Sequence, residues 1–129
     1  MNAVTDDGVD RDRGSASLTI VLLAPLLLVL MFAGFQAAMW NHTRTEARVI
    51  ARETAVLVAR DRLPARQASA AASASLVSDS VLTGARVSIE TTAAVVIVTI
   101  TGQAPGVLRG TSAPVRVTVA LPLEGWVPL

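Results

Sequence analysis

The sequence contains no cysteine, one histidine and few aromatic residues, and each absence removes a class of protein. Without cysteine there is no disulfide, no thiolate nucleophile and no cysteine-based zinc or iron–sulfur centre. One histidine leaves few ligands for any other metal site. Aromatic residues make up 3% of the chain, too few for base-stacking surfaces, and all the cations are arginines scattered along it, so we expect no nucleic-acid partner.

Catalytic motifs are missing as well. The chain has no Gly-rich phosphate loop, no G-x-S-x-G and no H-x-x-x-H pattern, and its carboxylates show no paired spacing. His42 stands just after Trp40 at the end of an apolar run, where a polar-tipped ring suits the headgroup zone better than a ligand or base role. The sequence therefore predicts a protein that binds rather than catalyses, with no catalytic residue, cofactor or metal site.

What the sequence does have is an apolar run from Leu18 to Trp40, and no residue between Arg13 and Arg44 carries a formal charge. As a helix this run reaches about 35 Å, slightly more than the ~30 Å hydrocarbon core of a bilayer. A single span must be helical, because its backbone groups find no partner in lipid. We predict a transmembrane helix over residues 15–42, bent at Pro25, where the bond to the Val21 carbonyl is lost.

Beyond the span, the residues from Thr43 to Arg62 contain no helix breaker, so the helix is expected to continue out of the membrane. Arg44, Arg48 and Arg52 recur at four-residue steps and share one stripe that has no acidic partner on its own helix. The stripe is open to three interpretations: contact with anionic headgroups, contact with acidic residues of a partner helix, or a plain solvated face.

After Pro64 the stretch from Ala65 to Leu82 is rich in alanine and serine. We predict a second, weakly amphipathic helix with Ala68, Ala72 and Leu76 on one side and Gly84 just past its end; the alternative is a flexible linker.

Beyond Gly84 the apolar period changes to two, which indicates strands. Three segments show it: Arg86–Glu90, Ala94–Thr101 and Val115–Leu121. The short link between the first two favours an antiparallel hairpin, and a long loop rich in glycine and proline precedes the third. Three strands alone are marginal, so their apolar face must be covered by the preceding helix or by another chain.

These elements define an α+β single-pass membrane protein with a long N-terminal transmembrane helix, a short second helix and a small three-stranded antiparallel sheet. The expected divisions are a cytoplasmic leader (1–14), the transmembrane helix (15–42), an extracytoplasmic helical region (43–82) and a small β domain (83–129). Residues 1–13 of the leader are polar and acidic and are expected to be disordered. Small residues on adjoining turns of the span would let other helices approach closely, and they are Ala33, Gly34, Ala37 and Ala38.

The order of motifs resembles the TadE family, the pseudopilins or minor pilins of tight-adherence (Flp) type IV pilus systems, in an actinobacterial-type form. The resemblance rests on Arg13-Gly14-Ser15-Ala16-Ser17-Leu18-Thr19 before an apolar helix with an early proline, on FQAAMWNHTRTEARVIARE after the span, and on the closing TGQAPGVLRG…APVRVTVALPLEGWVP. On the N-terminal motif alone, the alternative is a helix-starting segment with Ser15 or Ser17 as its N-cap.

The resemblance implies that a prepilin-type peptidase cuts after Gly14, so that Ser15 becomes the mature N-terminus behind the basic Arg13. The family usually carries a glutamate five residues past the cut, and this chain has Thr19 there, which makes an uncleaved, membrane-resident assembly factor the competing possibility. Implied partners are membrane lipid, other pilin-like subunits and the pilus assembly platform.

The resemblance also implies a cytoplasmic N-terminus and an extracytoplasmic C-terminal domain. Counting arginines near the span favours the opposite, with two before it and four by Arg60, but those four lie on a helix mixed with acids. The low-charge composition of the C-terminal region agrees with export. Outside this family, the alternative function is a bitopic accessory or sensor module unrelated to pili.

Overall fold

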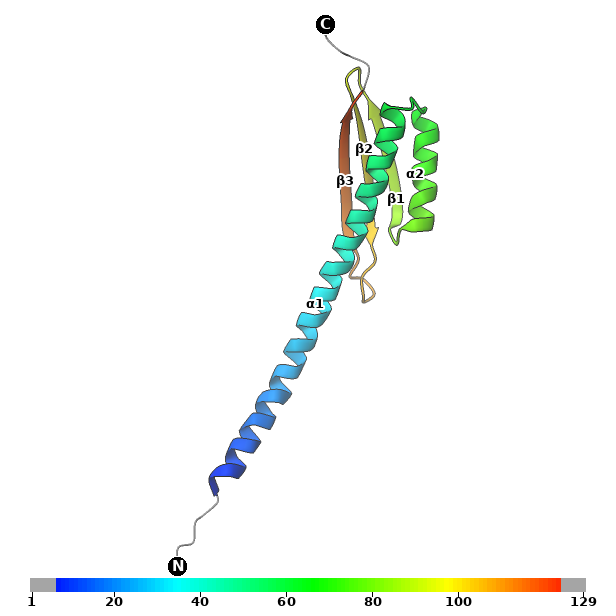
Figure 1. Ribbon diagram of the computed structural model, residues 1–129. Coiled ribbons are helices and arrows are strands. Elements are labelled where there is room, and N and C mark those ends of the chain that lie inside the picture. Colours follow the sequence, from blue (N-terminus) through cyan, green and yellow to red (C-terminus); the bar gives the residue numbers. More distant parts are fainter. Residues whose placement is uncertain (1–6, 124–129) are drawn as a thin grey trace, which may run out of the picture. The chain divides into compact units, whose positions relative to one another are not determined.

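The structure, a computed structural model, describes residues 7–123, with side chains from Gly14 onward. Along the chain it contains α1 (Asp7–Ala59), α2 (Ala65–Asp79), β1 (Thr83–Thr91), β2 (Val95–Ala104) and β3 (Ala113–Pro122), as Figure 1 shows. The predicted α+β class, with one long apolar N-terminal helix and a three-stranded antiparallel sheet, is confirmed.

The chain divides into two compact units, Met1–Phe35 and Gln36–Leu129, and α1 contributes residues to both. In the first unit, the side chains of residues 14–35 are all exposed. This part of α1 is long and apolar enough to cross a membrane, and none of its most apolar window is buried.

Helix α1 begins earlier than the sequence suggested. It starts at Asp7, so the expectation of a disordered leader is wrong for residues 7–13. Ser15 and Ser17 lie well inside the helix, and the N-cap interpretation of either serine is wrong too. Acidic residues near Asp7 favour a helix start there, because carboxylates stabilise the positive end of the helix dipole.

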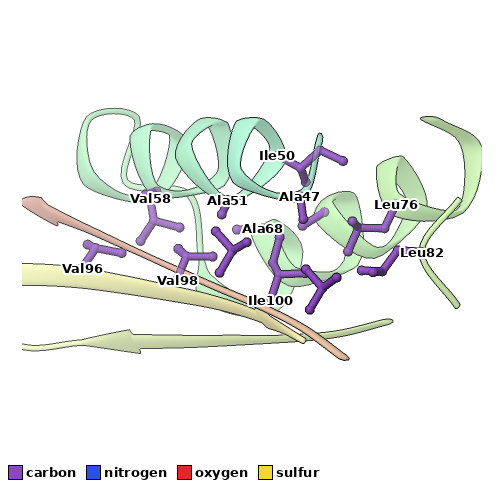
Figure 2. Close-up of a cluster of buried hydrophobic side chains, with 14 of the residues drawn as sticks. Ala47, Ile50, Ala51, Val58, Ala68, Leu76, Leu82, Val96, Val98 and Ile100 are labelled. Carbon is purple, nitrogen blue, oxygen red and sulfur yellow. The ribbon is translucent and has the colours of Figure 1, made fainter. Parts of the chain in front are cut away.

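The second unit is built on a sheet in the order β1-β2-β3, with β2 in the centre. The antiparallel register pairs Ile89 with Val98 and Ile100 with Val117, so the apolar side chains of all three strands share one face. That face packs against both helices, as Figure 2 shows. Of the two possible covers for the sheet, the structure therefore uses the preceding helices of the same chain.

Most of the residues that the two helices pack against the sheet are small. On α1 the side chains of Ala47, Ala51 and Ala55 are 0% exposed and recur every four residues, which places them on one stripe. On α2 the buried residues are Ala68, Ala72 and Leu76, the face predicted from the sequence.

Helix α2 ends at Asp79, earlier than expected, and Gly84 is not its terminal residue. Ser80 is already extended and its Oγ accepts a hydrogen bond from the backbone N–H of Leu82 at 3.1 Å. Gly84 lies within β1 with φ of 60°, where the pairing with β2 shifts register. The helix ends before Leu82, whose side chain is buried in the core. Gly84 adopts the positive φ that the register shift in β1 requires.

Candidate functional site

The residues of the expected processing site, Arg13, Gly14, Ser15 and Thr19, all lie within α1. The side chain of Arg13 is outside the described residues. A Cβ on Gly14 would meet nothing within 4 Å, so the fold itself leaves room for a side chain here. Any requirement for glycine would have to come from a partner such as a peptidase.

Thr19 satisfies its hydroxyl within its own helix. Its Oγ1 donates to the backbone carbonyl of Ser15 at 2.8 Å. A hydroxyl bonded in this way is tolerated in lipid, whereas an ionised carboxylate at this position would need a partner. With threonine at position 19, the helix needs no neighbouring amine there. The processing role of these residues stays a prediction.

The apolar part of α1 presents hydrophobic side chains on every side. Leu22 and Met31 are 70% and 71% exposed, and Pro25 lies inside the helix, which continues past it. A helix that is apolar all round belongs either in a protein core or in lipid, and among the described residues nothing buries this one. This surface is available to lipid and to other membrane helices.

The basic stripe does not form a single site, because Arg44 differs from the other two arginines. Its guanidinium lies 5.3 Å from the ring centre of Trp40, a cation–π contact. The Trp40 ring in turn donates its Nε1–H to the carbonyl of Pro114 at 3.1 Å. Arg44 is thus partly occupied by an aromatic neighbour that is itself fixed to the start of β3.

Arg48 and Arg52 are exposed and line an open groove between α1 and β3, about 510 Å³ in volume. The strand side of the groove is Thr118–Leu121. Within residues 14–123 no carboxylate forms an ion pair with either arginine. Among the described residues β3 pairs only with β2, so its other edge is unpaired there, and the groove combines this strand edge with two cations.

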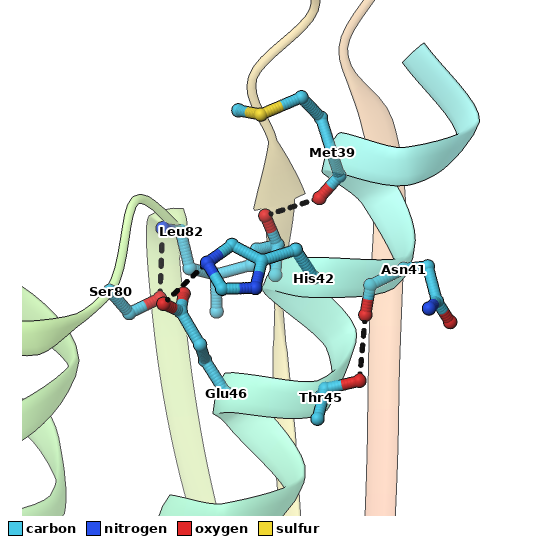
Figure 3. Close-up of polar contacts among 8 residues, drawn as sticks. Met39, Asn41, His42, Thr45, Glu46, Ser80 and Leu82 are labelled. Atoms are coloured by element: carbon cyan, nitrogen blue, oxygen red, sulfur yellow. Dashed lines mark hydrogen bonds and ion pairs between the residues drawn. The ribbon is translucent and has the colours of Figure 1, made fainter. Parts of the chain in front are cut away.

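A side-chain contact that the sequence analysis missed joins His42 and Glu46, which lie one turn apart on α1. Nε2 of His42 is 3.1 Å from Oε1 of Glu46, as Figure 3 shows. The second carboxylate oxygen of Glu46 is buried and has no hydrogen-bond partner among the described residues. The i,i+4 spacing of His42 and Glu46 is the sequence signal for this contact.

Nothing in the described part of the chain resembles a metal centre. No group of three or more histidine, cysteine, aspartate or glutamate side chains gathers within it. Residues 14–123 present three features that could contact a partner: an apolar helix, a basic groove beside a strand edge, and a compact α/β unit.

Comparison with known proteins gives one match. The protein-family model described as TadE-like protein matches residues 14–56, about a third of the chain. No curated protein and no solved structure matches the chain. The matched segment begins at Gly14 and runs through the apolar part of α1 to the basic stripe, so the resemblance inferred from the sequence is confirmed there: residues 14–56 are similar to TadE-like proteins.

Proposed function

We propose that the chain is a membrane-anchored, pilin-like component of a tight-adherence (Flp, type IV-like) pilus assembly or secretion system, and that it acts by association rather than catalysis. The observation that carries the proposal is the position of the family match. It begins at Gly14 and covers the whole apolar part of α1, whose side chains are exposed on all sides.

Two surfaces are suited to association with other pilin-like subunits or with the assembly platform. The span offers the small residues Ala33, Gly34 and Ala37, which permit close helix–helix contact in lipid. The second unit offers the unpaired edge of β3, flanked by Arg48 and Arg52, which fits an acidic partner segment.

The proposal includes an orientation: N-terminus in the cytoplasm and residues after Trp40 outside. Because the chain has no native cysteine, a single cysteine is a unique label. Ser73 and Ser88 are exposed and suit substitution. Ser73→Cys and Ser88→Cys should react with a membrane-impermeant maleimide in intact cells to the same extent as after lysis. Protection of both sites until lysis, with a cytoplasmic protein equally protected, would reverse the orientation.

The proposal also includes cleavage after Gly14, which separates a processed subunit from a resident factor. The intact mass of the protein from the producing cell should then correspond to a chain that begins at Ser15. Gly14→Leu should abolish cleavage, and Gly14→Ala is the matched control, because the fold leaves space for either side chain. A native mass that retains residues 1–13 would show an uncleaved assembly factor.

Thr19 provides a test of association that does not depend on the cut. Thr19→Glu should leave cleavage intact and increase recovery of neighbouring subunits in chemical cross-linking, because it supplies a carboxylate for a subunit's N-terminal amine. Thr19→Gln is the uncharged control of the same size. Equal cross-linking in both variants would show that no amine lies beside this position.

A further inference from the structure

The loop between β2 and β3 is fastened to α1 by one glutamine. Gln36 accepts a hydrogen bond at Oε1 from the backbone N–H of Val107, at 2.9 Å, and donates from Nε2 to the backbone carbonyl of Thr111, at 3.1 Å. One side-chain amide thus holds both sides of the loop. These residues all belong to the unit Gln36–Leu129.

The tip of this loop has a defined shape. The Thr111 hydroxyl donates to the carbonyl of Leu108 at 2.7 Å and accepts from its N–H at 3.2 Å, and the Thr111 N–H also reaches that carbonyl. Gly106 permits the close return of the chain, since a Cβ there would lie 2.5 Å from the backbone carbon of Thr111. Gly110, with φ of 84°, completes the turn.

This ordered turn directs apolar side chains outward. Leu108 is 63% exposed and Val107 is 40% exposed, and Arg109 beside them is exposed as well. The two neighbouring aliphatic residues thus form a small exposed apolar patch on a turn of fixed shape. Two aliphatic residues followed by a cation match the layering of a lipid interface, where acyl chains give way to phosphates.

The position of Gln36 sets the depth of the loop. It lies inside the apolar run Leu18–Trp40, seven residues past its midpoint at Val29, or about 10 Å along the helix axis. The hydrocarbon extends about 15 Å from the bilayer centre, half of its ~30 Å thickness, so Gln36 lies only about 5 Å inside its boundary, a depth that interfacial apolar groups reach. An unpaired amide at this depth would be costly, and the backbone groups of Val107 and Thr111 provide its partners.

We propose that the β2–β3 loop is a second membrane contact, in which Val107 and Leu108 enter the interfacial layer of the leaflet where the span ends and Arg109 meets lipid phosphates. The occupant of this surface is the bilayer itself, because the loop is bonded to a residue that already lies within the apolar run. The proposal requires only that α1 spans the membrane, and it does not depend on a role in pilus assembly.

The test uses the full chain in vesicles of phosphatidylcholine and phosphatidylglycerol, with a nitrobenzoxadiazole fluorophore on a single cysteine. Leu108→Cys and, independently, Val107→Cys place the label on the tip. Ala93→Cys, in the exposed link between β1 and β2, is the matched control. Met31→Cys, in the apolar run, reports that the helix has inserted. Doxyl quenchers are carried on lipids near the headgroup or deep in the acyl chain.

Labels on the tip should be quenched by the shallow doxyl lipid at least about twofold more than by the deep one, the pattern of groups that lie at the headgroup boundary. The label at position 93 should not be quenched by either. If Met31 is quenched deeply while both tip labels behave like position 93, the loop does not touch the membrane. Blue-shifted emission at the tip without doxyl quenching would identify a protein contact and would equally overturn the proposal.

Discussion

Replacing Ile100 with alanine tests how the sheet is covered. Ile100 is 0% exposed at the centre of β2 and faces the helices. Ile97 lies on the opposite face of the same strand and is only half-buried, so Ile97→Ala removes the same atoms from a different environment. The two variants are therefore a matched pair that differs in burial alone.

The expected loss in the free energy of unfolding for Ile100→Ala has two parts. Loss of three buried carbons costs about 2.4 kcal/mol at ~0.8 kcal/mol each, and the cavity left behind raises the total toward 3–4 kcal/mol. At Ile97 the expected cost is about 1 kcal/mol, since water already reaches the side chain. A unit of this size has a stability of roughly 5–14 kcal/mol, so both variants should still fold.

Pulse proteolysis in urea, on the full chain in detergent micelles, measures the difference. With a urea dependence of about 1–1.5 kcal/mol per molar, Ile100→Ala should lower the unfolding midpoint by roughly 2–4 M and Ile97→Ala by about 1 M or less. Equal shifts for the two variants would refute the assignment of the helix-covered face. A larger shift for Ile97 would mean that this face is covered in the micelle by another chain.

Three further outcomes follow from the packing. Thr54→Val should change the free energy of unfolding by less than about 1 kcal/mol by the same assay, because the buried Thr54 hydroxyl only donates back to the Ile50 carbonyl of its own helix; a loss above 2 kcal/mol would contradict this. Gly102→Ala should destabilise by about 1–3 kcal/mol, since its Cβ would lie 2.6 Å from Cγ of the buried Leu82. Leu28→Arg, which costs about 2.5–3.5 kcal/mol at the bilayer centre, should leave the protein largely resistant to carbonate extraction, and a fully soluble product would show that the rest of the run is too weak an anchor.

The sequence predicted the elements of this fold well where one periodic pattern was enough. Alternating β-branched residues identified all three strands, but β1 begins at Thr83 rather than Arg86, because pairing with Gln103 resumes beyond the irregularity at Gly84. β2 likewise extends to Ala104, where it still pairs with Ala113. Strand ends depend on their partners, and a single segment does not contain that information.

The contacts that define the sites joined residues far apart in sequence and were not predicted. Gln36 bonds to Val107 and Thr111, and Trp40 bonds to Pro114, at separations of 71 to 75 residues. Within the helix, Arg44 was expected to meet headgroups, a partner helix or solvent, and the contact of its guanidinium with the ring of Trp40 was not foreseen. Local patterns place a residue on a face, but its partner is decided by which strand the sheet brings beside it.

The alanine stripe of α1 also has a consequence for the order of synthesis. Three alanines leave the ribosome before the strands that cover them: Ala47, Ala51 and Ala55. They stay uncovered, next in sequence to the apolar run, until the strands have been synthesised. Each alanine leaves only one methyl group open in that interval, worth about 0.8 kcal/mol of burial, against 1.5–3 kcal/mol for a leucine or isoleucine. The nascent helix thus carries a surface that fits tightly once the sheet is complete and adheres weakly to other chains until then.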